Sequence, residues 1–144
     1  MSEANNNLYK FQEWLEGKIA AVLPEGIDVL CRRKGNIDND ISNALASIGI
    51  AVVVEPPLPL EWSESCILSC NKAESEVHIL ENVLLQDTAE SAYSLLEKIA
   101  HALHGARNPE IGASILKLEA VRDESPADEA VIHFVLPISN SLSL

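Results

Sequence analysis

A run of aliphatic, mostly β-branched residues at positions 50–54 constrains the fold more than any other segment. Its five side chains show no alternation with polar residues, and Gly49 and three prolines bound it on either side. A short, continuous apolar run of this kind is typical of a strand that is buried on both faces. The sequence therefore predicts a strand in the interior of a sheet.

A proline-rich segment follows this strand, and we name residues 56–62 the arm. Pro56 and Pro57 lack the amide proton that a sheet ladder needs, and they favour extended backbone. Leu58, Leu60 and Trp62 then alternate along the segment. We expect these side chains to cover either the chain's own core or a neighbouring subunit, and we take all five residues as interface candidates.

Three segments have the three- and four-residue apolar spacing of amphipathic helices. They span residues 8–23, about 38–48 and about 87–105. In the first, Glu16 falls among the polar residues that we expect on the solvated face. Asp38 or Asp40 is expected to cap the second helix. Asp87 and Glu90 have the spacing of a capping box at the start of the third.

The remaining regular segments read as strands, expected at residues 27–31, 66–70, 76–85, 115–121 and 130–136. The polar residues 71–75 would join two of them as an antiparallel hairpin, and the acidic residues 122–129 would join the last pair. This order predicts one α+β domain over residues 1–144, an α/β sandwich whose mostly antiparallel sheet has helices packed on one face. Residues 1–7 and 140–144 are expected to be flexible.

The charge balance disfavours several kinds of partner. The 144 residues include 22 acidic and 10 basic side chains, which gives a formal net charge of −12. Such a surface repels nucleic-acid phosphates and anionic lipids, so we expect neither sequence-specific nucleic acid nor a membrane as a partner. No apolar run approaches the length of a membrane span, and the first residues lack the pattern of a signal peptide. We therefore expect an intracellular protein.

The cysteines and two of the histidines have plain structural interpretations. Cys31, Cys66 and Cys70 are an odd number of thiols, which we interpret as free and buried like small hydrophobic residues. His101 and His104 lie three residues apart near the end of the third helix. Because no third ligand shares their face, we interpret them as polar residues that suit a helix C-terminus and not as a metal site.

The sequence contains no motif that assigns a reaction. Glycine-rich phosphate loops and the common nucleophile and zinc motifs are absent from it. His78 and His133 lie within two predicted strands and could meet across the sheet, but a pair of histidines alone defines no site. We therefore expect no catalytic residue, no cofactor and no metal.

Arg32, Arg33 and Lys34 form the only basic cluster of the chain. On a molecule of net negative charge, such a cluster is a natural docking point for acidic residues of another copy. The acidic residues 122–129 are the matching candidates. We therefore add these three basic residues to the interface candidates of the arm.

Two short motifs resemble those of a known family. Residues 81–85 read Glu-Asn-Val-Leu-Leu at the end of a predicted strand, and residues 102–105 read Ala-Leu-His-Gly at the end of the following helix. Together with the helix between them, they resemble the Mu-like tail-terminator (minor tail) proteins of tailed bacteriophages and prophages. The order of elements along the whole chain is also similar to that family.

The resemblance implies a structural protein that is not an enzyme. Members form a ring, commonly a hexamer, on the tail tube, where the ring ends tube polymerisation and offers a surface for head joining. The implied partners are further copies of the chain, the tail tube protein and head–tail connector proteins. The implied locations are the cytoplasm of the bacterial host during assembly and then the virion tail. The alternative function is a small cytosolic ligand-binding or regulatory domain that uses the exposed sheet face.

Overall fold

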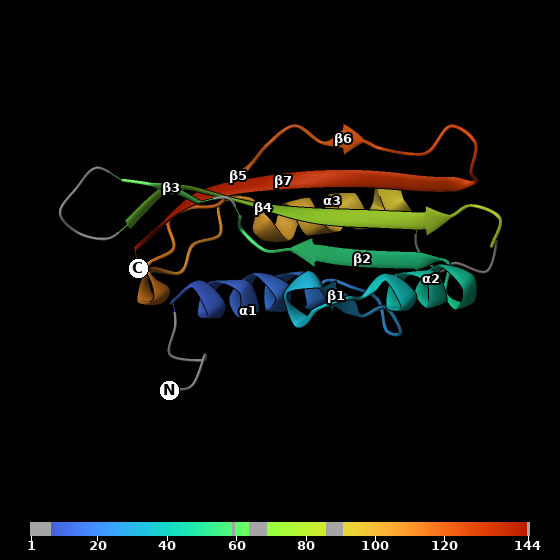
Figure 1. Ribbon diagram of the computed structural model, residues 1–144, viewed down its shortest axis with the longest axis horizontal. Coiled ribbons are helices and arrows are strands. Elements are labelled where there is room, and N and C mark those ends of the chain that lie inside the picture. The colour runs from blue at the N-terminus through green and yellow to red at the C-terminus, as the bar shows by residue number, and fades with distance from the viewer. Residues whose placement is uncertain (1–6, 59, 64–68, 86–90, 144) are drawn as a thin grey trace.

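Helices and a long mixed sheet make up the fold, in a computed structural model that describes residues 7–58, 60–63, 69–85 and 91–143 (Figure 1). The α-helices are α1 (Asn7–Ala20), α2 (Asp38–Ser47) and α3 (Ala92–Leu103). The strands are β1 (Val29–Cys31), β2 (Ile50–Glu55), β3 (Leu60–Trp62), β4 (Ser69–Asn82), β5 (Lys117–Leu118), β6 (Arg122–Asp123) and β7 (Val131–Ser143). Short 3-10 helices lie at Arg32–Lys34 and Pro109–Ile111. The predicted α+β class is confirmed.

The strands form one sheet in the order β1-β2-β4-β7-β5, with β3 paired to β4 and β6 paired to β7. β1 is parallel to β2, and the other described pairs are antiparallel. The long strands β4 and β7 form the centre of the sheet, and the 14 residues of β4 span about 45 Å. This length gives the molecule its elongated outline in Figure 1.

α1 and α3 pack on one face of the sheet and enclose the core there. Phe11, Leu15 and Ile19 of α1 are fully buried, because they recur at the three- and four-residue spacing that lines one side of a helix. α3 contributes Leu95 and Ile99 in the same way. The strand side chains of this core come from alternate positions of the sheet: Ile50, Val52, Val54, Ala73, Val77, Ile79, Phe134, Leu136, Ile138 and Leu142.

The first half of β2 confirms the predicted interior strand, since Val52 and Val53 are both buried although they point to opposite faces. α2 lies near the end of β4. There the carboxylate of Glu81 accepts a hydrogen bond from the first amide of α3, and Asn82 donates to the Leu45 carbonyl of α2. Because consecutive strand residues point to opposite faces, α2 contacts the sheet from the side away from α3, so the expectation that the helices pack on one face holds for α1 and α3 but not for α2.

The predicted hairpin at residues 66–85 is wrong. Residues 71–75 were expected to form its connection, but they lie inside the single strand β4, with a register shift between Cys70 and Ala73. β7 pairs along nearly all of β4 and so satisfies the backbone without a turn. The polar side chains of Lys72 and Glu74 misled the prediction, because they alternate with the buried Ala73 and Ser75. Residues 64–68 lie outside the described part.

The C-terminal part also differs from prediction. Residues 140–143 were expected to be flexible, but they complete β7, and Leu142 is buried in the core. The expected strand at 115–121 is reduced to the two residues of β5, and β6 forms within the expected acidic loop. Asn7 begins α1, and its side chain donates to the carbonyl of Ser143. Residues 1–6 and 144 lie outside the described residues.

The helix ends partly match the predicted signals. Gly49 and Gly105 follow α2 and α3 with positive φ angles of 90° and 73°, as left-handed terminal residues do. α3 is capped by Ser91, whose hydroxyl accepts from the Ser94 amide. Neither predicted aspartate supplies a side-chain cap to α2. The expected capping pair of α3, at 87 and 90, falls outside the described residues.

Candidate functional site

The predicted basic cluster is largely used inside the chain. Arg33 forms two hydrogen bonds of 2.8 Å to the carboxylate of Glu16, and its guanidinium lies 4.7 Å from the centre of the Tyr9 ring. The hydrogen bonds and the charge of Glu16 raise the pKa of the Arg33 guanidinium above its ordinary value, although burial acts in the opposite direction. Glu16 is therefore a buried partner, and its expected place on the solvated face of the helix is wrong.

Arg32 turns to the other side of the sheet. Its guanidinium contacts Asp38 at 3.0 Å and Glu55 at 3.3 Å, and Lys34 is the exposed member of the cluster. The Asp38 side chain therefore pairs with Arg32 and does not cap α2 as expected. Because both arginines already have carboxylate partners, the cluster does not present three free positive charges to another copy.

The arm divides into a buried part and an exposed part. Pro57 is buried, Pro56 is half-buried, and Leu60 packs against the core as the first residue of β3. Leu58 and Trp62 expose 61% and 54% of their surface. The arm thus covers its own core and also presents two large apolar side chains. Pro59 lies outside the described residues.

A network of charged and polar groups crosses the sheet face that points away from α1 and α3. Glu76 of β4 accepts from Arg122 of β6 at 2.8 Å, and because β7 lies between these strands, the Arg122 side chain spans β7. Burial opposes the charge of Glu76, but Arg122, with help from His78, brings its pKa below the ordinary value. Arg122 also pairs with Glu124 at 3.1 Å, within the same segment. Its bond to Glu76 ties β6 to the middle of the sheet.

His78 and His133 meet on this face, as their positions in the sequence allowed. Nδ1 of His78 lies 2.8 Å from Nε2 of His133, and the ring centres are 5.1 Å apart. Nε2 of His78 lies 3.3 Å from the Glu76 carboxylate and 4.0 Å from that of Glu55. Burial, together with the charge of His78, lowers the pKa of His133. The pair thus forms the centre of the network.

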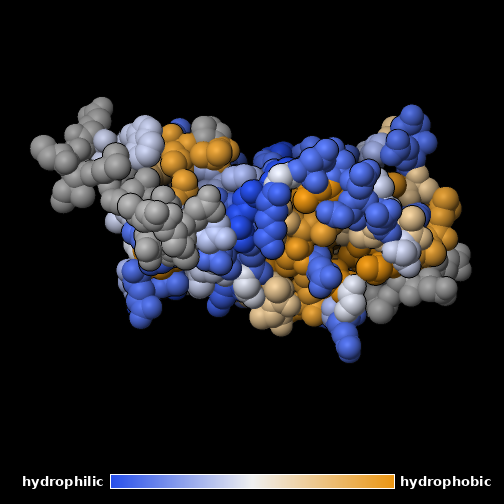
Figure 2. Space-filling model, turned by 60° about the horizontal axis from the view of Figure 1, so that its bottom comes forward, coloured by the Kyte–Doolittle hydropathy of each residue, from blue (hydrophilic) through white to orange (hydrophobic). Residues whose placement is uncertain are grey.

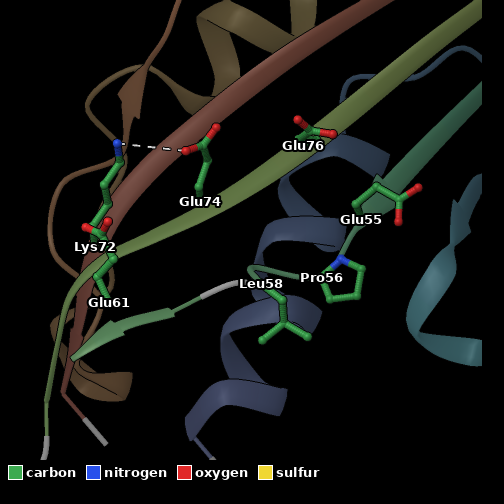
Figure 3. Close-up of a pocket in the computed structure, with 7 residues that line it drawn as sticks. All are labelled: Glu55, Pro56, Leu58, Glu61, Lys72, Glu74 and Glu76. Atoms are coloured by element: carbon green, nitrogen blue, oxygen red, sulfur yellow. Dashed lines mark ion pairs between the residues drawn. The ribbon is translucent and has the colours of Figure 1, made fainter.

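An open groove of about 440 Å³ adjoins the network (Figure 3). Its walls are Glu55, Pro56, Leu58, Glu61, Lys72, Glu74 and Glu76. Lys72 lies 3.8 Å from Glu74, so one positive charge faces four carboxylates. The groove is therefore electronegative, with an apolar side formed by the arm.

Hydrophobic side chains gather on the half of the surface that carries α2 and β1 (Figure 2). A hollow of about 250 Å³ in this region is lined by apolar, polar and acidic residues of these elements and their neighbours, among them Leu30 of β1, Asp40 of α2 and Ile48 just after α2. β1 is the outermost strand of the sheet on this side. The surface here combines the outermost strand of the sheet with a hollow that is partly apolar and partly acidic.

Exposed apolar side chains also mark the two ends of the long sheet. We call the exposed Leu58 and Trp62, beside and within β3, the β3-end patch, and the exposed Val83, Leu84 and Tyr93, after β4 and at the start of α3, the loop-end patch. β3 pairs with β4 near Ala73, whereas the loop-end patch follows Asn82, nine residues or about 30 Å along the strand. Val83 and Leu84 belong to the sequence motif at 81–85, but no signal in the sequence indicated that they are exposed or that the two patches lie at opposite ends.

The described cysteines and the histidine of α3 that the sequence singled out do not lie together in one site. Cys31 and Cys70 are buried free thiols, and burial together with Glu16 raises the pKa of Cys31 to about 11. His101 is exposed and lies 4.0 Å from Glu97 of the same helix. Among the described residues, no cluster of three or more histidine, cysteine or acidic side chains is arranged to hold a metal ion. Cys66 lies outside the described residues.

The described helices are each too short or too polar to span a membrane. No model of a known protein family matches the chain, and no curated protein matches it.

Proposed function

We propose that this protein is a non-enzymatic assembly subunit that forms a ring of identical copies through its two unlike ends. A closed ring needs heterologous contacts, in which one surface of a subunit meets a different surface of the next. The observation that carries the proposal is the presence of two unlike apolar patches at opposite ends of the sheet. Leu84 exposes 77% of its surface in the loop-end patch, and the β3-end patch presents Trp62.

The resemblance in the sequence gives this proposal its biological form. In that form the ring, commonly a hexamer, caps the tail tube of a bacteriophage or prophage, ends tube polymerisation and provides the surface for head joining. Its partners are the tail tube protein and head–tail connector proteins. The protein then acts in the bacterial host cytoplasm during assembly and afterwards in the virion tail. The motif at 81–85 supports this form, because it supplies two of the three residues of the loop-end patch.

The two ends can be tested separately. Trp62→Lys and Leu84→Lys each place a charge in one patch, and Val121→Lys is the matched control, since Val121 is an exposed apolar residue between the ends. Light scattering after size-exclusion chromatography and negative-stain electron microscopy measure the assembly state. We expect rings for the wild type and the control and monomers for each end variant. A wild type that stays monomeric up to about 1 mM would contradict the proposal.

Mixing the two end variants distinguishes a ring from a symmetric dimer. In a head-to-tail ring, each variant retains one intact patch, and the two intact patches fit each other. The mixture should therefore form heterodimers, while each variant alone stays monomeric. If the wild type is instead a dimer and the mixture gives no new species, the contact is symmetric and the ring is refuted.

One observation favours the alternative function of a ligand-binding or regulatory domain. The groove of about 440 Å³ has a volume in the range of small-molecule sites (Figure 3). Such sites are lined mainly by apolar and aromatic groups, whereas five of the seven residues here are charged. We therefore prefer the assembly function.

A further inference from the structure

The contact between His78 and His133 leaves room for one proton. At 2.8 Å, one of the two facing nitrogens donates and the other accepts. When both rings are neutral, His133 can donate to His78, and His78 can donate through its other nitrogen to Glu76. One added proton still leaves one donor and one acceptor on the facing nitrogens: it can enter at Nδ1 of His133, which keeps the direction of the first bond, or the shared proton can pass to Nδ1 of His78, which reverses it. A second added proton puts a donor on both facing nitrogens, so the bond is lost and two cations meet.

Charged groups surround the pair from each neighbouring element. β2 contributes Glu55, whose carboxylate also contacts Arg32 beyond the end of β1. β4 contributes Glu76, which pairs with Arg122 of β6. The charges of Asp123 and Glu124 act on His133 from the other side. Carboxylates thus flank both rings, so the first positive charge is compensated, whereas the second is opposed by the ring beside it.

His133 is also the residue that holds the segment after β6. Its amide donates to the hydroxyl of Ser125 at 2.9 Å, and its carbonyl accepts from the amide of Glu124 at 2.8 Å. The Ser125 hydroxyl and amide in turn bind the carboxylate of Asp123. Displacement of the His133 ring from His78 therefore acts on the same residue that anchors positions 123–125.

We propose that the His78–His133 pair is a proton-operated latch, closed when at most one ring is charged, that loosens residues 123–125 when both rings are protonated. In the closed state the two rings are hydrogen-bonded and the segment lies along β7. In the open state the charged His133 ring turns away from His78, and the backbone hydrogen bonds that His133 makes to Ser125 and Glu124 weaken. Arg122 remains bound to Glu76 and keeps the segment tethered.

The direction of the pKa shifts sets the pH range of the latch. The pKa of His133 lies below its ordinary 6.5, so the closed state is favoured above that pH and is lost as the pH falls through the lowered value. The pKa of Glu76 lies below its ordinary 4.5, so the tether to Arg122 persists until the pH falls through that still lower value. Mild acid should therefore open the latch without releasing the tether.

The test is a histidine titration by NMR combined with amide exchange of Glu124 and His133 in the full chain. The His133 ring should titrate below its ordinary range, and exchange protection, corrected for intrinsic rates, should fall about tenfold between about pH 7.5 and about pH 5, the order expected for one lost hydrogen bond. His78→Gln removes the neighbouring charge, so it should raise the pKa of His133 and reduce the pH dependence of protection. His101→Gln is the control, because His101 is exposed on α3.

The latch is refuted if protection of the Glu124 and His133 amides does not change with pH. It is also refuted if His78→Gln leaves the titration of His133 unchanged. Should His78→Gln fail to fold, the pH dependence of amide protection in the wild type decides, with His101→Gln as the control.

Discussion

Removal of Arg33 should destabilise the fold far more than removal of its neighbour Arg32. Arg33 and Glu16 join the 3-10 helix after β1 to α1, with side chains that are only 15% and 10% exposed. Arg33→Met preserves most of the side-chain length but leaves the Glu16 carboxylate buried without its cation. Arg32→Met breaks pairs with Asp38 and Glu55, whose side chains are 73% and 27% exposed, and Arg32 itself is 34% exposed.

The magnitudes differ because water compensates one loss and not the other. Loss of one partner of a buried ion pair costs about 3–5 kcal/mol, and we expect the lower end because Arg33 retains some exposure. At about 3–4 °C for each kcal/mol in a chain of this size, the melting temperature should fall by about 10 °C. For Arg32→Met we expect a loss within about 1 kcal/mol, as for exposed ion pairs.

Urea denaturation of four proteins measures the coupling: wild type, Arg33→Met, Glu16→Leu and the double variant. The double variant removes both charges, so it should recover most of the stability that either single change loses. The reasoning is refuted if Arg33→Met costs no more than Arg32→Met, or if the two single losses simply add. Charge reversal of Arg33 is consequently no clean test of an interface, since it should disturb the fold itself.

Two further predictions concern the close packing around Gly112 and the burial of Cys31. Gly112→Ala should lower the free energy of unfolding by about 1–3 kcal/mol in thermal unfolding, because Gly112 has a φ of +73° and an added Cβ would lie 2.7 Å from the Ser143 carbonyl oxygen. Gly17→Ala in α1 is the matched control: it has open space around it and should raise the free energy of unfolding by about 0.5–1 kcal/mol. In a Cys66→Ser/Cys70→Ser background, Cys31 should react with a thiol reagent at about pH 8 at least about a hundredfold more slowly when folded than in urea, since its pKa is raised from 9.0 to about 11. Equal rates in the two states would contradict the burial of Cys31.

Local periodicity predicted the elements whose pattern is set by one face. Phe11, Leu15 and Ile19 repeat with the period of a helix, and they are the buried side of α1. The apolar run of β2 has no polar interruption because both of its faces are covered. In these segments the local sequence and the tertiary environment require the same residue types, so the sequence was sufficient.

Prediction failed where a distant strand decided the outcome. Residues 71–75 look like a turn, but pairing with β7 extends β4 through them. Residues 140–143 have little pattern of their own and are ordered by the same pairing, with Leu142 in the core. Glu16 looked solvated because its partner Arg33 lies 17 residues away. The strand partners are fixed by sheet register, and the partner of Glu16 by the packing of α1 beside the 3-10 helix that follows β1; a single sequence encodes neither locally.

Salt dependence separates the two ways in which copies of this chain could associate. Arg32 and Arg33 are already paired, so contacts through the basic cluster have little free positive charge to offer. Copies that each carry a net charge of −12 repel one another, and salt shortens the range of that repulsion from about 10 Å at 0.1 M to about 3 Å at 1 M. Association through the β3-end and loop-end patches should therefore strengthen as salt rises, which sedimentation at several salt concentrations would measure. Weakening with salt would instead support docking between Lys34 and the acidic residues 122–129, and would refute the end-to-end contact.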